Sequence, residues 1–151
     1  MKRGFTLTEL VIALVILALL VTVFAGGIKN TTRSAKYAEV RDAVNHIFKG
    51  VYEFARDVGR YPNNLRELVN GSGITGWRGT YVSIQVNSNG IAEKGGVRIG
   101  YRIYSGNTSC GNLNNRPALI IYGKGNDVVL QRYLENYCLV RSGNNLIVVL
   151  R

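Results

Sequence analysis

The feature that most constrains the fold is an uncharged apolar run of nineteen residues, from Leu10 to Ile28. Thr22 supplies the one polar side chain in this run. At about 1.5 Å per residue, a helix of this length nearly spans the ~30 Å hydrocarbon core of a bilayer. A buried helix of a soluble domain normally carries a polar face, which this run lacks. The pattern therefore predicts a transmembrane helix.

A cleavable secretory signal is the alternative interpretation of the same run. A basic leader precedes the run, and Ala25, Gly26 and Gly27 imitate a small-residue cleavage site. Glu9 argues against this interpretation, because a carboxylate set directly against an apolar run is costly in a membrane. A disposable signal gains nothing from such a charge, so we expect the run to stay in the mature protein.

The first ten residues, MKRGFTLTEL, resemble the class III signal of type IV prepilins and type II secretion pseudopilins. The shared features are a short basic leader, then Gly-Phe-Thr-Leu-x-Glu, then the apolar run. The resemblance implies that a prepilin peptidase cuts after Gly4 and methylates the new N-terminal residue, Phe5. Glu9 takes the place of the family's glutamate, whose carboxylate would pair with the free amine of Phe5 on a neighbouring subunit.

Two features depart from the pilin pattern. Major type IVa pilins usually carry a proline in the part of the helix where this chain has Gly26 and Gly27. Each glycine costs about 1 kcal/mol of helix propensity relative to alanine, so we expect local melting or bending there. Lys29, Arg33 and Lys36 follow the apolar run, so the distribution of positive charge does not favour a cytoplasmic N-terminus. The predicted topology therefore rests on the resemblance.

After the apolar run, apolar side chains recur at intervals of three and four residues, which is the pattern of an amphipathic helix. These positions are Tyr37, Val40, Val44, Ile47, Val51, Phe54 and Val58. The pattern predicts one helix from Phe5 to about Gly59, roughly 80 Å long, with Gly59 and Pro62 at its end. His46 is expected on the surface of this helix, paired with Asp42.

Beyond residue 80 the period shifts to two, which indicates strands. Before that point, Asn63 or Asn64 is expected to cap a short helix that ends at Val69, and Trp77 to pack a glycine-rich loop on the core. The strand candidates are residues 80–86, 97–103, 117–122, 127–134, 137–140 and 145–150. The predicted fold is α+β: a long N-terminal helix packed on an antiparallel meander of roughly four to six strands, as in type IV pilins.

The predicted organisation has four parts. Residues 1–4 are the leader peptide, residues 5–28 the transmembrane and filament-core helix, residues 29–60 the amphipathic half of the helix, and residues 61–151 a globular sheet domain.

Cys110 and Cys138 are the two cysteines of the chain. In an exported domain of this size we expect them to pair, which matches the disulfide loop of many type IV pilins, and free thiols are the alternative. On the chain-entropy model this bond would stabilise the domain by about 3 to 4 kcal/mol.

The composition argues against catalytic and metal-binding functions. With one histidine, two cysteines and nine acidic residues, the chain has little material for a metal site or a catalytic dyad. We therefore expect no enzymatic activity, no cofactor and no metal. Asp127 and Glu135 are too few carboxylates for the calcium site of major secretion pseudopilins, which favours a pilus over a secretion system.

The leading hypothesis is a structural subunit, major or minor, of a type IV pilus-like filament that polymerises through the N-terminal helix. The resemblance implies three kinds of partner: identical or related pilins, the prepilin peptidase and an inner-membrane assembly platform. Before assembly the protein would span the bacterial inner membrane once, with a cytoplasmic N-terminus; afterwards it would lie in a cell-surface or periplasmic filament. The alternatives are a pseudopilin of a type II secretion system and a pilin that binds DNA during uptake.

The DNA alternative depends on charge. Nineteen Lys and Arg against nine Asp and Glu give the chain a net charge of +10. Arg98, Arg102 and Tyr104 alternate along one face of a predicted strand, where they would contact phosphates and stack on bases. Charged strand faces are also commonly just solvated, so both interpretations stay open.

Overall fold

The structure is a computed structural model that describes residues 6–151, without the side chains of residues 23–31. The leader residues and Phe5 lie outside the described residues. The chain divides into two compact units, Met1–Ala35 and Lys36–Arg151.

Helix α1 spans Leu7–Val58, and its backbone is helical through Gly26 and Gly27, so the melting expected there is absent. Helix formation is cooperative, and the cost of two glycines is small within a long helical stretch. The end of α1 follows the prediction. Gly59 has a φ of 81°, which favours a residue without Cβ, and its N–H donates to Ala55 O at 2.9 Å.

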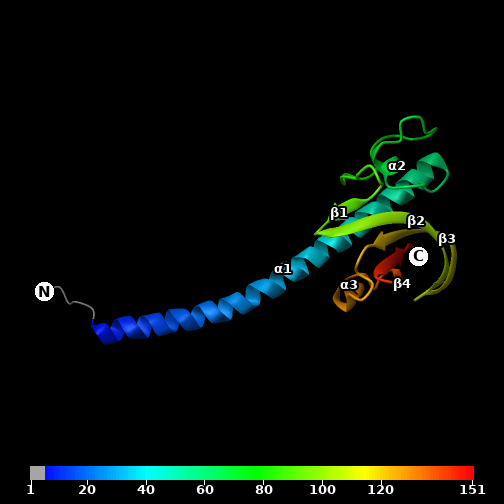
Figure 1. Cartoon of the computed structure of the whole chain (residues 1–151). Helices are drawn as coiled ribbons and strands as arrows, with labels where there is room; N and C mark the ends of the chain where they lie inside the picture. The colour runs from blue at the N-terminus through cyan, green and yellow to red at the C-terminus, as the bar shows by residue number, and fades with distance from the viewer. Residues whose placement is uncertain (1–5) are drawn as a thin grey trace. The chain divides into compact units, whose positions relative to one another are not determined.

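One antiparallel sheet of five strands follows α1, in the order β1-β2-β3-β5-β4. The predicted α+β class is confirmed (Figure 1). The sheet is not a simple meander, because β5 lies between β3 and β4. The strands are β1 Ala92–Lys94, β2 Val97–Thr108, β3 Gly111–Ile121, β4 Cys138–Ser142 and β5 Asn145–Val149.

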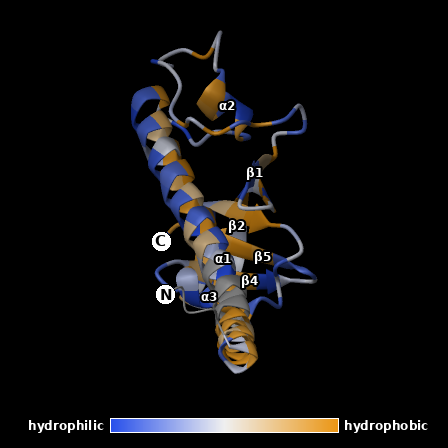
Figure 2. Cartoon of the chain, turned by 90° about the vertical axis from the view of Figure 1, so that its left-hand side faces the viewer, coloured by the Kyte–Doolittle hydropathy of each residue, from blue (hydrophilic) through white to orange (hydrophobic). Residues whose placement is uncertain are grey.

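The core of Lys36–Arg151 forms where α1 packs on this sheet. The predicted apolar stripe of α1 is buried from Tyr37 to Phe54, with exposed fractions of 4% or less, and Val58 is partly buried. In Figure 2 this part of α1 carries hydrophilic residues along one side. The sheet contributes to the same core through Ile99, Leu119, Ile121, Leu146 and Val148.

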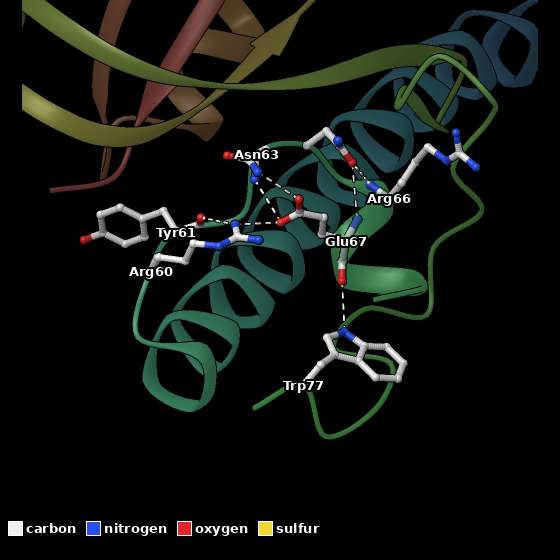
Figure 3. A network of polar contacts seen from close by, with 7 residues as sticks. Arg60, Tyr61, Asn63, Arg66, Glu67 and Trp77 are labelled. Carbon is white, nitrogen blue, oxygen red and sulfur yellow. Dashed lines mark hydrogen bonds and ion pairs between the residues drawn. The ribbon is translucent and has the colours of Figure 1, made fainter. Parts of the chain in front are cut away.

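Helix α2, Arg66–Val69, confirms the predicted short helix. The N-cap residue is Leu65, which makes no side-chain cap bond, but Asn64, one of the two predicted caps, lies one residue earlier, and its Oδ1 accepts hydrogen bonds from the N–H groups of Arg66 and Glu67 at 2.9 and 3.3 Å. The indole Nε1 of Trp77 donates to Glu67 O at 3.0 Å, and the Glu67 carboxylate accepts from Arg60 at 2.9 Å (Figure 3). These bonds attach the glycine-rich loop to α2 and to the chain just after α1, and Trp77 packs against the core, as predicted.

Two strand predictions are wrong. Residues 80–86 form no strand, and Val86 makes only an isolated bridge with Ala92. The sheet gains β1 instead, which the sequence pattern did not indicate because three residues are too few for a visible alternation.

Residues 127–134, the second wrong strand, contain helix α3, Val128–Tyr133. Asp127 caps this helix, since its Oδ1 accepts the N–H of Leu130 at 3.1 Å. Leu130 and Leu134, four residues apart, bury one face completely. The β-branched pair Val128 and Val129 suggested a strand, but the cap and the leucine spacing decide the local structure.

The Asp127 carboxylate also ties α3 to α1. Its Oδ2 accepts from Tyr37 Oη at 2.6 Å and lies 3.2 Å from Lys124 Nζ. Burial by itself raises the pKa of Asp127, but the bonds from Tyr37, Leu130 and Lys124 together hold this pKa below its ordinary value.

We predict that Asp127→Asn lowers the free energy of unfolding by about 1 to 3 kcal/mol, because a partly buried charged acceptor is lost. A lowered native pKa means that the carboxylate stabilises the fold above its unfolded-state pKa of about 3.9, and that this contribution disappears as pH falls through the native value. The variant should therefore lose less stability than the wild type when the pH falls from about 5 to about 2. Urea denaturation of the full chain in detergent, followed by Trp77 fluorescence, measures both effects.

The matched control is Asp42→Asn, which changes an exposed carboxylate. Equal dependence of stability on pH for the wild type and Asp127→Asn would contradict the prediction.

Candidate functional site

Reciprocal hydrogen bonds between Thr6 and Glu9 begin α1. The Thr6 N–H and hydroxyl donate to Glu9 Oε2 at 2.9 and 3.0 Å, and the Glu9 N–H donates to Thr6 Oγ1 at 3.3 Å. This arrangement is a capping box, which satisfies two of the amide donors that a helix leaves free at its N-terminus. The carboxylate of Glu9 is thereby held against the residue that follows Phe5 in the chain.

Glu9 stands out in the sequence through its charge, whereas the role of Thr6 becomes visible through its hydrogen bonds to Glu9. The available signal was the spacing Thr6-x-x-Glu9 directly before an apolar run, which is the mark of a capping box. Gly4 and Phe5 lie outside the described residues, so cleavage at Gly4 and pairing of Glu9 with the Phe5 amine stay predictions.

A continuous apolar surface follows the capping box. Every leucine, isoleucine and valine from Leu7 to Val21 is exposed, with fractions between 48% at Val11 and 82% at Leu7. Thr22 donates its hydroxyl to Leu19 O at 2.7 Å, so this polar side chain is satisfied within the helix. Covering the apolar surface would be worth on the order of 10 to 20 kcal/mol. Such a surface is expected to be covered by another molecule.

The predicted transmembrane helix comprises residues 5–28. Phe5 and the side chains beyond Thr22 in this range lie outside the described residues. In the part of the chain that the structure describes, no helix is both long enough and apolar enough to cross a membrane.

A disulfide joins Cys110 to Cys138, with their Cα atoms 5.3 Å apart. Cys110 lies at the turn between β2 and β3, and Cys138 is the fully buried first residue of β4. Beside the disulfide, the Ser109 N–H donates to Leu139 O at 3.0 Å and the Leu139 N–H donates to Ser109 Oγ at 2.8 Å. The tip of the β2–β3 hairpin is thereby held on β4, the edge strand of the sheet. A covered edge strand is protected from pairing with other chains.

We predict that Cys138→Ser lowers the free energy of unfolding by about 2 to 5 kcal/mol, the usual effect of losing a disulfide from a small exported domain. Cys110→Ser should have a similar effect, and the double variant should be no less stable than Cys138→Ser, because one cross-link is lost in each case. Denaturation of the full chain in detergent measures the stabilities, and maleimide labelling measures free thiols. Two reactive thiols in the native protein, purified under non-reducing conditions, would contradict the prediction.

The proposed nucleic-acid residues lie on the face of β2 opposite to α1, since they alternate with the core residues Ile99 and Tyr101. Arg102 lies over the ring of Tyr104, with its guanidinium carbon 5.9 Å from the ring centroid. Arg98 lies over Tyr122 instead, at 5.5 Å, about 13 Å along the strand from Arg102. The structure therefore brings Arg102 and Tyr104 together and leaves Arg98 apart.

The observed partner of His46 is Ser83, not the predicted Asp42. The Ser83 N–H donates a hydrogen bond to His46 Nε2 at 3.2 Å. Among the described residues, no ion pair joins His46 to Asp42. The Ser83 N–H lies outside any strand, so the imidazole supplies the acceptor that a ladder would have supplied. No cluster of three or more metal-ligating side chains occurs in the described part of the chain.

Comparison with known proteins identifies the N-terminal segment. Residues 1–25 match the model of the prokaryotic N-terminal methylation motif, the class III signal of type IV pilins and pseudopilins, which confirms the predicted resemblance over this segment. No curated protein and no solved structure matches the chain. The matched segment includes both residues of the capping box and the exposed apolar helix from Leu7 to Thr22.

Proposed function

On the basis of the methylation motif, we propose that this protein is a prepilin whose mature form is a structural subunit of a type IV pilus-like filament. One observation carries the proposal: the motif stands directly before a helix whose apolar side chains from Leu7 to Val21 are all exposed. After cleavage of the leader, this exposed apolar helix would remain in the mature protein. Such a helix suits a subunit that polymerises through it. The abundance of this chain in the filament decides whether it is the major or a minor subunit.

The apolar helix serves two environments in succession. Before assembly, residues 5–28 would cross the inner membrane once, with the N-terminus in the cytoplasm and Lys36–Arg151 on the exported side. During assembly the same surface would move from lipid to the helices of neighbouring subunits. Lipid and neighbouring helices both cover apolar side chains, so the helix loses little buried apolar area when it moves from one to the other. The partners are then related pilins, the prepilin peptidase and an assembly platform.

Glu9 supplies what apolar burial lacks, which is a fixed register. The hydrogen bonds from Thr6 satisfy one carboxylate oxygen but leave the negative charge uncompensated. Cleavage after Gly4 would create an amine on Phe5, the only group of opposite sign that processing adds to the segment. An uncompensated charge in an apolar phase is expensive, so pairing Glu9 with the Phe5 amine of a neighbour would favour one axial position of the helix over others.

The environment of Asp127 supports a pilus over a calcium-binding secretion pseudopilin. Both of its carboxylate oxygens are engaged, by Leu130 on one side and by Tyr37 and Lys124 on the other. Calcium needs several free oxygen ligands, and Glu135 is the other acidic residue between Cys110 and Cys138. For the DNA alternative, the contact between Arg102 and Tyr104 is the supporting observation, but Arg98 lies apart from it, so the filament function is the one proposed.

We predict that the mature chain begins at a methylated Phe5. The full chain, produced together with a prepilin peptidase, should lose Met1 to Gly4, because glycine leaves the scissile bond unobstructed. Intact mass and N-terminal sequencing measure this. Gly4→Val should stay uncleaved and is the matched control. Retention of Met1 in assembled material, or cleavage near Gly27, would refute the prepilin interpretation.

We predict that Glu9→Gln leaves membrane insertion intact and lowers filament yield at least about tenfold, since the variant keeps the size of the side chain and removes the charge that docking uses. Alkaline extraction of membranes measures insertion, and sheared surface filaments measure assembly. Glu135→Gln, which neutralises an exposed carboxylate elsewhere in the chain, should assemble normally. Normal filaments from Glu9→Gln would show that the pairing is dispensable.

A further inference from the structure

Helix α3 has apolar side chains on two faces. Leu130 and Leu134 are fully buried, so one face belongs to the core. Val128 and Val129 lie outside the core and are 64% and 46% exposed. Among the described residues of Lys36–Arg151, four large apolar side chains are exposed, and these two valines are adjacent.

The exposed surface of this valine pair adds little to the stability of the fold. Valine is a poorer helix former than alanine because its branched Cβ loses rotamer freedom in a helix. An exposed valine adds little burial to offset that cost. Exposed adjacent apolar side chains are expected where another surface covers them.

Two arginines lie beside the valine pair. Arg132 follows Val128 by four residues, so the two lie on the same side of α3. Val129, Arg132 and Arg41 line one groove of about 480 Å³, to which Glu135 adds a carboxylate. The other nearby acid, Asp127, is already paired with Lys124. We name this surface the α3 patch and define it by Val128, Val129, Arg41, Arg132 and Glu135, with Lys124, which lies over the ring of Tyr37, and Lys36, which precedes Tyr37 in the chain, at its edge.

The α3 patch lies where α1 enters the unit Lys36–Arg151. Tyr37 is the second residue of this unit, and its hydroxyl donates to the capping carboxylate of α3 at 2.6 Å. Figure 1 shows α3 beside this part of α1. Lys36 follows the last residue of the apolar run, Ile28, by eight residues. Even a fully extended chain of that length spans at most about 29 Å.

We propose that the α3 patch docks on an anionic phospholipid surface while the protein is anchored in the membrane. The valines enter the boundary between headgroups and acyl chains, and the cationic side chains contact lipid phosphates. This inference rests on the proposed function, because the anchored apolar run supplies the tether. The tether keeps the patch at high effective concentration near the lipid, so weak docking is enough.

Charge and size favour lipid over a second copy of the chain. An isologous contact between two α3 patches would bring together two surfaces that each carry more cationic than acidic side chains, which is unfavourable. Two valines also supply far less than the ~800 Å² per partner that stable protein interfaces bury. An anionic bilayer offers complementary charge and requires no matching shape.

Bromolipid quenching in the full chain tests the proposal. Val129→Trp is reconstituted in phosphatidylcholine vesicles containing about 30% phosphatidylglycerol, with or without acyl-chain bromination. The signal of the native Trp77 is subtracted with the wild-type chain. Trp77 adjoins Gly76, which packs against Asp57 of α1, about 30 Å along the helix from Tyr37, so it should escape quenching. We expect bromination to lower the emission of the new tryptophan at least about twofold.

Charge variants and a second probe position complete the test. Lys36→Gln with Arg132→Gln should reduce the quenching, whereas the control Arg116→Gln with Arg141→Gln, which changes exposed arginines elsewhere, should not. Val128→Trp serves as the probe if Val129→Trp perturbs folding. An unquenched tryptophan at both positions overturns the proposal. Quenching that requires more than one chain per vesicle also overturns it, since a second copy would then be the partner.

A probe within the apolar run separates the two proposals. Leu14→Trp in the same vesicles should be quenched by brominated acyl chains. If it is quenched while the α3 probes are not, the anchor stands and the docking proposal fails. If neither is quenched, membrane anchoring fails and the docking proposal falls with it.

Discussion

The burial of one stripe of α1 against the sheet is the interaction on which the rest of Lys36–Arg151 depends. Val40, Val44, Val51 and Phe54 are each 0% exposed, and no other helix of comparable length covers this face of the sheet in the described part of the chain. The polar contacts are built around this packing. The Asp127 bonds secure α3 at one end of the buried stripe, and the Arg60–Glu67 pair secures α2 at the other. Removal of a large side chain from the stripe would therefore loosen both attachments.

Helix α1 has two kinds of apolar surface, one that stabilises the fold and one that is left for contact with other molecules. The stripe from Tyr37 onward is narrow and is satisfied inside the unit. The surface from Leu7 to Val21 runs around the whole helix and is satisfied by nothing within the described chain. An amphipathic stripe stabilises a single fold, whereas an apolar surface on all sides adapts to lipid or to neighbouring helices without a change of conformation.

The sequence predicted the features that depend on periodicity and failed where short segments or local caps decide. The stripe of α1, its end at Gly59 and the strand from Val97 follow from repeats of apolar side chains. Residues 127–134 were misassigned because the strand preference of two valines outweighed a one-residue signal, the Asp127 cap. The position of β5 between β3 and β4 leaves no trace in periodicity, because order in a sheet is set by long-range packing. At the N-terminus, Glu9 was found through its charge, whereas Thr6 acts through a hydrogen bond and needed the capping spacing to be noticed.

The hairpin tip held by Cys110 and Cys138 also imposes an order of events. The side chain of Cys138 is 0% exposed once β4 has paired with β5 and the tip has docked. An oxidant therefore reaches this sulfur only while the tip is still open, so the disulfide must close before or while the tip docks on β4. A chain that completes its folding before it meets an oxidant would bury the reduced thiol of Cys138 and leave the disulfide unformed. The order of oxidation and folding is in this way set by the burial of a single sulfur atom.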